Sequence, residues 1–167
     1  MTVIVFGLPG SGKSYFASAL AERIKCDYIS SDKLRRELFQ VRTYTDDEKE
    51  TVYRVMLEKA LEALKNNRDV VVDATFSRKS LREKVFDKIE QGGAVKWIEV
   101  RANEQLVKER LKKTRIESEA DYNIYLRLKE QWEPMEEEHL VLVSTNENLE
   151  MMLTAALHYL SNPDDRN

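Results

Sequence analysis

The feature that most constrains the fold is a glycine-rich turn close to the start of the chain. An apolar run, Val3 to Phe6, leads directly into Gly7-Leu8-Pro9-Gly10-Ser11-Gly12-Lys13-Ser14, which fits the pattern GxxxxGK[ST]. Apolar residues in helical spacing follow from Tyr15 to Ile24. A strand, a tight turn and a helix in this order predict a turn that lies at the positive end of the helix.

The residue types in this turn are those that hold phosphate groups. Glycines allow successive backbone N–H groups to turn inward around phosphate oxygens. Lys13 would supply a cation for the β- and γ-phosphates, and the Ser14 hydroxyl is a suitable ligand for Mg²⁺. We therefore predict a site for a nucleoside triphosphate with Mg²⁺, formed by Gly7, Pro9, Gly10, Ser11, Gly12, Lys13, Ser14 and Tyr15.

Length and charge limit the remaining function classes. A chain of 167 residues has room for one domain with a substantial core, so we expect residues 1–167 to form a single domain. The formal net charge of −3 provides no overall positive field that would attract nucleic acid or an anionic membrane. A local basic cleft remains open.

Cysteine, histidine and apolar content point to a soluble cytoplasmic protein. The lone Cys26 excludes an internal disulfide and fits a reducing compartment, and His139 and His158 do not have zinc-ligand spacing. The turn begins at residue 7, which leaves no room for a signal peptide, and no apolar run has the length of a bilayer. We expect no membrane association and no obligate protein partner.

Apolar, strand-like runs recur along the chain and alternate with helical patterns. They lie at 2–6, 27–30, 69–73, 94–101 and 140–144. This alternation predicts an α/β three-layer sandwich, in which a parallel sheet of about five strands carries helices on both faces. A long helix is expected over 46–66, with Thr45 and Glu48 as a capping box, and a terminal helix over 149–160.

Residues 102–134 have a different pattern, which predicts a small helical lid. Asn103 can cap a helix that ends near Lys113, and Ser118 with Asp121 can cap a second helix that runs to Pro134. The break between them is polar and charged, so we place a candidate lid around 110–120. The alternative is an ordinary solvated connection between two helices.

Polar side chains follow the second and third strand-like runs, where ligands bind in open α/β sheets. Asp32 follows the second run, and Arg35 lies one turn later; together they could take up the proton of an acceptor hydroxyl and hold the acceptor. Asp73 and Thr75 follow the third run, where Asp73 could hold Mg²⁺ through water or orient the acceptor. The alternatives are structural: Asp32 and Asp73 as helix caps, and Thr75 as a turn hydroxyl.

These residues together resemble the family of small P-loop kinases that includes the 5′-hydroxyl kinase domain of phage polynucleotide kinase. Zeta toxins and gluconokinase-type enzymes are more distant relatives. The resemblance covers most of the chain, as far as the Trp132-Glu133-Pro134 region. Its matching stretches are Gly7 to Ser14, Ser31-Asp32-Lys33-Leu34-Arg35, Val70-Val71-Val72-Asp73-Ala74-Thr75 and Glu109-Arg110-Leu111-Lys112-Lys113-Thr114-Arg115.

The resemblance implies a role for each matching residue. ATP and Mg²⁺ would be the cofactors, Asp32 the general base and Arg35 the arginine that binds the acceptor. Asp73 would help to position the acceptor, and Arg110 or Arg115 would reach the transferring phosphoryl group from the lid. The family's strand order, with the second and third strands on the same side of the first, would bring Asp32 and Asp73 to one cleft.

The resulting hypothesis is an ATP-dependent kinase that transfers the γ-phosphoryl group of Mg·ATP to a hydroxyl of a small molecule or of a nucleic-acid end. A small acceptor is favoured, because basic residues gather only in one short stretch, Lys108, Arg110, Lys112, Lys113 and Arg115. The alternatives are a polynucleotide 5′-hydroxyl kinase and a nucleotide-dependent switch or ATPase module without a hydroxyl acceptor. A switch needs no base that faces a hydroxyl, so Asp32 distinguishes it from a kinase.

Overall fold

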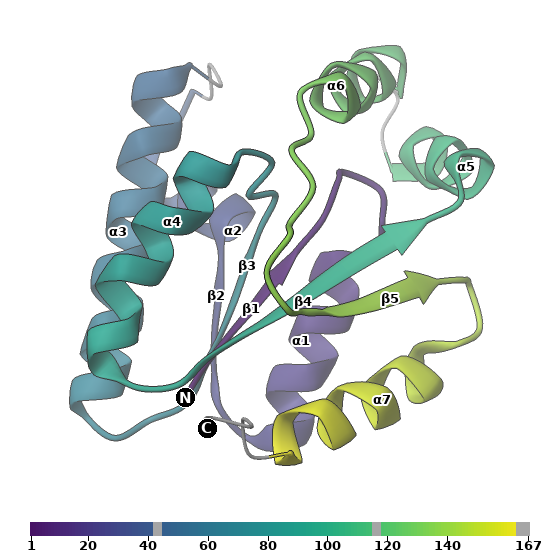
Figure 1. Cartoon of the computed structure of the whole chain (residues 1–167). Coiled ribbons are helices and arrows are strands. Elements are labelled where there is room, and N and C mark those ends of the chain that lie inside the picture. Colours follow the sequence, from purple (N-terminus) through teal and green to yellow (C-terminus); the bar gives the residue numbers. More distant parts are fainter. Residues whose placement is uncertain (42–44, 115–117, 163–167) are drawn as a thin grey trace.

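The architecture is a five-stranded parallel sheet covered by helices on both faces (Figure 1). The structure, a computed structural model, describes residues 1–41, 45–114 and 118–162, and at 91, 113–114 and 118–121 it describes the backbone alone. The strands are β1 (Thr2–Phe6), β2 (Asp27–Ser30), β3 (Val70–Ala74), β4 (Val95–Ala102) and β5 (Leu140–Ser144). Their order in the sheet is β2-β3-β1-β4-β5, which confirms the predicted α/β sandwich and the placement of β2 and β3 on the same side of β1.

The helices occupy the connections between parallel strands, except the last helix, which follows β5. They are α1 (Lys13–Ile24), α2 (Ser31–Leu38), α3 (Asp46–Lys65), α4 (Lys79–Ile89), α5 (Glu104–Thr114), α6 (Ser118–Glu130) and α7 (Leu149–Ser161), with a short 3₁₀ helix at Glu90–Gly92. The predicted helices over 46–66 and 149–160 are therefore confirmed to within one residue. Thr45 caps α3 as expected, because its hydroxyl accepts a hydrogen bond from the backbone N–H of Glu48.

Side-chain alternation in the central strand divides the core into two layers. Val3 and Val5 of β1 pack with α1 and α7, whereas Ile4 and Phe6 pack with α3 and α4 on the opposite face. All four side chains are fully buried. Burial of β1 on both faces explains why Val3 to Phe6 is an unbroken apolar run, and it fixes the direction in which the chain enters the turn at Gly7.

The last turns predicted for α6 are absent, because the chain is held against the sheet instead. The helix ends at Glu130, and not at Pro134 as the sequence pattern indicated. The buried Arg82 donates to the carbonyl oxygens of Glu133 and Pro134, and Trp132 stacks on Phe6 at a ring distance of 6.0 Å. A proline also disfavours helical geometry in the residue before it, here Glu133.

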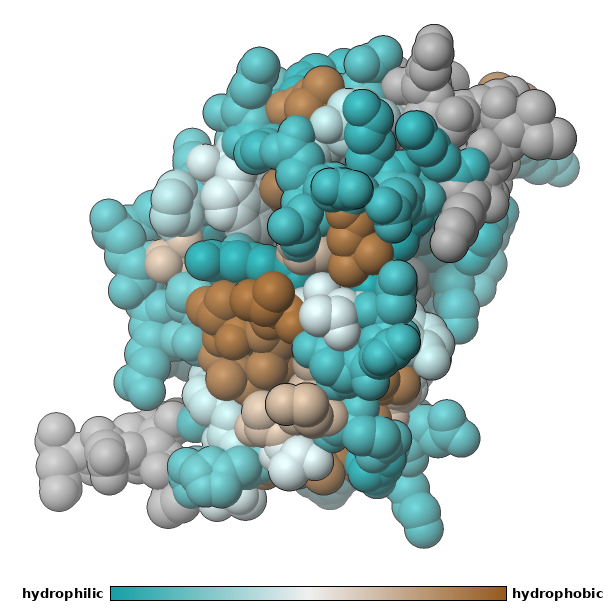
Figure 2. All heavy atoms as spheres, turned by 90° about the vertical axis from the view of Figure 1, so that its right-hand side faces the viewer, coloured by the Kyte–Doolittle hydropathy of each residue, from teal (hydrophilic) through white to brown (hydrophobic). Residues whose placement is uncertain are grey.

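The outer strand β5 and the helix α7 form a surface with an exposed apolar area. Figure 2 views the molecule from the side of β5 and α7 and shows an apolar area on an otherwise hydrophilic face. The large apolar side chains that these two elements expose are Val141, Val143 and Met151. Across the described ranges, every helix is too short or too polar to cross a membrane.

Candidate active site

The turn after β1 has the backbone geometry that its glycines allow. Gly12 adopts a left-handed conformation, with φ of 89°, and is the N-cap of α1. A Cβ atom at Gly7 would lie 2.3 Å from the carbonyl oxygen of Val100 in the neighbouring strand. Both positions therefore require glycine, and the turn delivers Lys13 and Ser14 into the first turn of α1.

Two polar side chains in this turn are buried with no protein partner among the described residues. Lys13 is only 9% exposed, yet it forms no hydrogen bond or ion pair there. The Ser11 hydroxyl is also buried without a hydrogen-bond partner. An ammonium group removed from water needs a compensating anion, so this arrangement fits the predicted binding of phosphate.

Asp73 lies at the end of β3 with one carboxylate oxygen unpaired. The side chain is 1% exposed, and its Oδ2 atom accepts a hydrogen bond of 3.0 Å from the Tyr28 hydroxyl. Its Oδ1 atom is buried and has no hydrogen-bond partner in the described part of the chain. The Tyr28 hydroxyl is also 3.4 Å from the carbonyl oxygen of Ser14, so it joins Asp73 to the first turn of α1. An unpaired carboxylate oxygen next to the Ser14 residue fits a hard cation held directly or through water.

The environment of Tyr28 agrees with this arrangement. Burial raises the pKa of the Tyr28 hydroxyl far above its usual range, and the negative charge of Asp73 raises it further. The hydroxyl therefore stays protonated and donates to Asp73. The capping alternative for Asp73 is not supported, because the N-cap of α4 is Arg78.

Asp32 and Arg35 lie at the same edge of the sheet as Asp73. Ser30, the last residue of β2, pairs in register with Asp73, and Asp32 follows in the first turn of α2 with an exposed side chain. The N-cap of α2 is Ser30, so Asp32 does not cap this helix. Arg35 is tied to α3: its Nη1 atom is 2.5 Å from Oε1 of Glu48, and the two side chains are 11% and 3% exposed.

The remaining predicted residues occupy several positions around the turn. Thr75 is half-buried two residues after Asp73, and Pro9 is half-buried within the turn. Tyr15 is 71% exposed, although it stands next to Ser14 in sequence. Arg115 lies outside the described residues, as does the centre of the predicted lid.

Arg110, in α5, contacts the glycine-rich turn and the end of β5. Its guanidinium donates to the Ser144 hydroxyl at 2.8 Å, to the Gly10 carbonyl oxygen at 3.3 Å and to the Thr145 carbonyl oxygen at 2.9 Å. The Ser144 hydroxyl in turn donates to the carbonyl oxygen of Ser11. These hydrogen bonds connect α5 and the end of β5 to the glycine-rich turn that is predicted to bind phosphate.

Sequence reasoning missed Tyr28 and Ser144. Ser144 ends β5 just as Asp73 ends β3, so the rule that selects polar residues at strand ends would have found it. Tyr28 carries no such signal, because it lies within a strand and reads as a core residue. Only the pairing of β2 with β3 brings its hydroxyl to Asp73.

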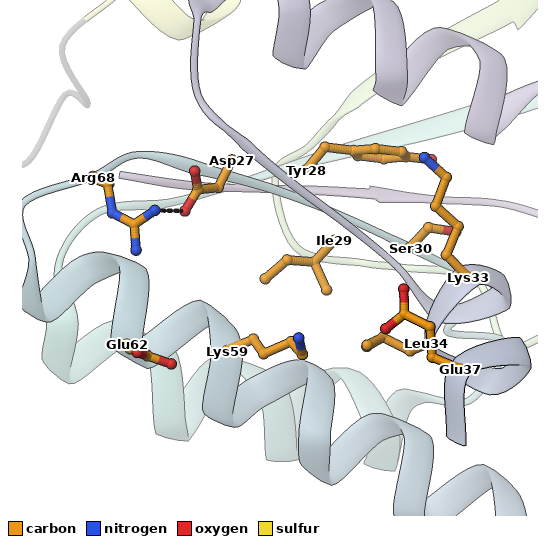
Figure 3. A pocket seen from close by; sticks show the side chains of 10 residues that line it. All are labelled: Asp27, Tyr28, Ile29, Ser30, Lys33, Leu34, Glu37, Lys59, Glu62 and Arg68. Carbon is orange, nitrogen blue, oxygen red and sulfur yellow. Dashed lines mark hydrogen bonds and ion pairs between the residues drawn. The ribbon is translucent and has the colours of Figure 1, made fainter. Parts of the chain in front are cut away.

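A pocket of about 340 Å³ lies between β2, α2 and α3, and it borders this site because Tyr28 and Ser30 are among its lining residues (Figure 3). Its lining combines acidic and basic side chains, and one opposite-charge pair, Asp27 with Arg68, crosses its end. None of the predicted site residues lines it. The candidate active site is therefore the edge where the glycine-rich turn, Asp73 and Asp32 meet.

Comparisons with known proteins agree with this fold. The profile of the AAA_33 family, described as an AAA domain, matches residues 3–135. No curated protein sequence matches the chain. An APS kinase, CysC of Mycobacterium tuberculosis, solved in complex with AMPPNP and APS, is 16% identical with a TM-score of 0.75, and the match covers 96% of this chain and 97% of that one.

Two further solved structures have the same architecture. A gluconokinase from Sinorhizobium meliloti is 19% identical with a TM-score of 0.69, over 96% of this chain and 97% of that chain. A sugar kinase from Janibacter sp. is 16% identical with a TM-score of 0.71, over 95% of this chain and 93% of that chain. At these identities the likeness establishes a P-loop kinase-like fold.

Proposed function

Because this chain belongs to the AAA_33 family of AAA domains, we propose that it is a P-loop kinase that transfers the γ-phosphoryl group of Mg·ATP to a hydroxyl of a small molecule. One observation carries the proposal. The buried Lys13 ammonium and the buried Asp73 carboxylate, each with an unsatisfied polar atom or charge, lie at the same edge of the sheet as the exposed Asp32. A structural scaffold would not keep the Lys13 ammonium and the Oδ1 atom of Asp73 out of water without hydrogen-bond partners.

In this proposal the glycine-rich turn and Lys13 hold the triphosphate. The Ser14 hydroxyl and the unpaired Oδ1 atom of Asp73, the latter through water, would hold Mg²⁺, which supplies positive charge to the β- and γ-phosphates when bound. Tyr28 keeps Asp73 oriented toward Ser14 by donating to its other oxygen. Lys13 neutralises charge on the phosphoryl oxygens as transfer proceeds.

Asp32 is the proposed general base. It accepts the proton of the acceptor hydroxyl while the acceptor oxygen forms a bond to the γ-phosphorus and the bond from that phosphorus to the bridging oxygen of ADP breaks. Arg35 and Thr75 would position the acceptor beside it. Arg110 and Arg115 would serve the transferring group from the lid, and for Arg110 this requires release from Ser144 and Thr145.

The solved relatives support a small acceptor. Gluconokinase and APS kinase, by their names, act on small molecules, and the M. tuberculosis enzyme was solved with the ATP analogue AMPPNP. A nucleotide-dependent switch is the rival from another class. A switch would not need an exposed carboxylate, such as that of Asp32, at the edge of the sheet that we propose binds the triphosphate.

Incubation with γ-labelled ATP, Mg²⁺ and a panel of hydroxyl compounds tests the proposal. The wild-type chain should label at least one alcohol, and Lys13→Ala should lower the rate at least about 100-fold, because one cation at the transition state is lost. Lys88→Ala, which removes an exposed lysine of α4, is the matched control. Turnover by Lys13→Ala within a few-fold of wild type would overturn the assignment. If labelled phosphate is released, no acceptor is labelled and a protein partner stimulates the release, the switch hypothesis is supported and the kinase hypothesis is refuted.

A further inference from the structure

Glu133 lies in the connection between α6 and β5, and its three hydrogen-bonding groups all bind one other connection, the one between β3 and α4. Its backbone N–H donates to the carbonyl oxygen of Ser77 at 2.9 Å, and its own carbonyl oxygen accepts from Nη2 of Arg82 at 2.9 Å. Its carboxylate atom Oε2 accepts from the backbone N–H of Lys79 at 2.5 Å. One residue is therefore bound three times to residues 77–82, more than fifty positions earlier in the chain.

The carboxylate of Glu133 caps α4 from outside that helix. The first N–H groups of a helix need acceptors, which the side chain of the N-cap residue usually supplies. The N-cap of α4 is Arg78, whose side chain makes no capping bond in the described structure. Glu133 instead supplies the acceptor for Lys79, the first residue of α4, and its negative charge lies at the positive end of the helix. Because this cap comes from a distant segment, it fixes the position of the start of α4 relative to the end of α6.

The connection that Glu133 holds contains a strained turn. Phe76 is fully buried and has a left-handed φ of 45°, a conformation that aromatic residues rarely adopt. Its ring stacks on Tyr53 at a ring distance of 5.2 Å, and its carbonyl oxygen accepts from Nη1 of the buried Arg82 at 2.9 Å. Such strain persists only where the surrounding contacts hold it, and it is frequent at functional sites. Thr75, which we propose positions the acceptor, directly precedes this turn, so the turn determines where Thr75 lies.

The residues beside Glu133 connect it to the other parts of the candidate active site. Trp132 stacks on Phe6 with a ring distance of 6.0 Å and an interplanar angle of 7°, and Phe6 leads directly into the glycine-rich turn. The helix α6 ends at Glu130, two residues before Trp132, and the connection runs from there across the sheet to β5 (Figure 1). The stretch Trp132-Glu133-Pro134 therefore joins the strand before the glycine-rich turn, the second helix of the predicted lid and the β3–α4 connection.

We propose that Glu133 is a positioning residue for the phosphoryl acceptor: it holds the β3–α4 connection, and with it Thr75, at a fixed place relative to the glycine-rich turn. The inference rests on the proposed kinase function and adds to it a residue that acts through Thr75. Without the carboxylate of Glu133, the start of α4 loses an acceptor and the strained turn at Phe76 loses one of the contacts that hold it. The acceptor is then held less well, which raises its KM. The glycine-rich turn is formed by β1 and α1, so it should bind Mg·ATP as before.

The first measurement does not depend on turnover. Hydrogen exchange of the backbone amides, followed by NMR, compares wild type with Glu133→Ala and Glu133→Gln. The Lys79 amide should exchange at least about 10-fold faster in Glu133→Ala, because its charged acceptor is lost, and near the wild-type rate in Glu133→Gln, whose side-chain oxygen can still accept. Glu136→Ala is the matched control, because it removes the 3.6 Å ion pair with Nζ of Lys79 and leaves the backbone bonds in place. Equal exchange in Glu133→Ala and wild type would overturn the inference.

The second measurement follows transfer from γ-labelled ATP to gluconate, glucose, glycerol and a 5′-hydroxyl oligonucleotide, well below the Tm of each variant. For the compound that wild type labels, Glu133→Ala should raise the KM about 10-fold, with kcat and the KM for ATP within about two-fold of wild type. Glu133→Gln should restore most of the difference, and Glu136→Ala should match wild type.

A purely structural cap gives a different result. Glu133→Ala would then lower the Tm by about 2–4 °C and leave both KM values unchanged, because partial unfolding lowers kcat alone. That result would refute the inference while the kinase function stands. The kinase function itself is tested by wild type: if wild type labels none of the four compounds, the kinase function is refuted, and the inference about its acceptor fails with it.

Discussion

Replacement of Asp73 by asparagine should make the protein more stable and much less active. The wild-type carboxylate is 1% exposed, and a single hydrogen bond from Tyr28 compensates its charge. Asparagine has the same shape and can still accept that bond through its own oxygen. It removes the buried charge, and with it the oxygen that we propose holds Mg²⁺.

The size of the effect follows from two opposing terms. Burial of an ionised carboxylate costs several kcal/mol even after the surroundings relax. The new amide group places an N–H donor where Oδ1 has no partner, at a cost of about 1–3 kcal/mol. The balance favours Asp73→Asn by about 2 kcal/mol, which for a chain of this size corresponds to a rise in Tm of about 4–8 °C. Phosphoryl transfer should fall at least about 100-fold, as for the loss of one group that stabilises transition-state charge.

Scanning calorimetry without nucleotide and label transfer with Mg·ATP measure the two effects on the same samples. Asp87→Asn, at an exposed position of α4, is the matched control and should change neither. Tyr28→Phe should have the opposite effect on stability, a loss of about 1.5–3 kcal/mol, because both oxygens of Asp73 then lack a partner. If Asp73→Asn lowers the Tm, or if its transfer rate stays within a few-fold of wild type, Asp73 is a structural residue and the reasoning fails.

Three further predictions concern Asp32, Arg110 and Cys26. Asp32→Asn should abolish transfer while calorimetry shows affinity for Mg·AMPPNP within about three-fold of wild type, because Ser30 and not Asp32 is the N-cap of α2. Lost stability with retained transfer would contradict this. Arg110→Ala should raise the KM for ATP at least about 10-fold, since the glycine-rich turn loses a donor that makes bonds to Gly10 and Ser144; an unchanged KM would argue against it. Burial raises the pKa of Cys26 to about 11. Because only the thiolate reacts, iodoacetamide should modify Cys26 about 100-fold more slowly than a free cysteine at pH 7, with a rate that rises until about pH 11. Mass spectrometry at several pH values measures this rate. A rate equal to that of glutathione would refute the raised pKa.

The elements that sequence predicts well are those whose signals are local. The apolar runs place all five strands to within one residue, and the pattern of Thr45 and Glu48 gives the start of α3. The placement of β2 and β3 on the same side of β1 was predicted from the resemblance of the glycine-rich turn, Asp32 and Asp73 to a family, and it is confirmed. It brings the ends of β2 and β3 together, as expected.

The parts that sequence could not give depend on contacts between distant residues. Arg35 is predicted to bind the acceptor because it stands one turn after Asp32, and that role stays a prediction; its ion pair with Glu48, which lies on another helix, could not be predicted. The role of Arg110 at the phosphoryl group likewise stays a prediction, whereas its bonds to Ser144 and Thr145 could not be predicted because they need the chain to return through β5. The end of α6 is set by Arg82, some fifty residues earlier in the chain. None of these pairings leaves a periodic trace in the sequence.

The central position of β1 has a consequence for synthesis of the protein. Among the strands of the described residues, β1 has β3 and β4 as neighbours and β2 has β3 alone, so none of these native pairings can form until residues 70–74 exist. A growing chain that has reached residue 69 therefore carries the segments of β1, which is mostly apolar, and β2 with unpaired edges. Such edges promote aggregation, and contacts that span the chain form slowly. A chaperone that binds the nascent chain before residue 70 would therefore reduce aggregation more for this strand order than for a fold whose first two strands form a hairpin.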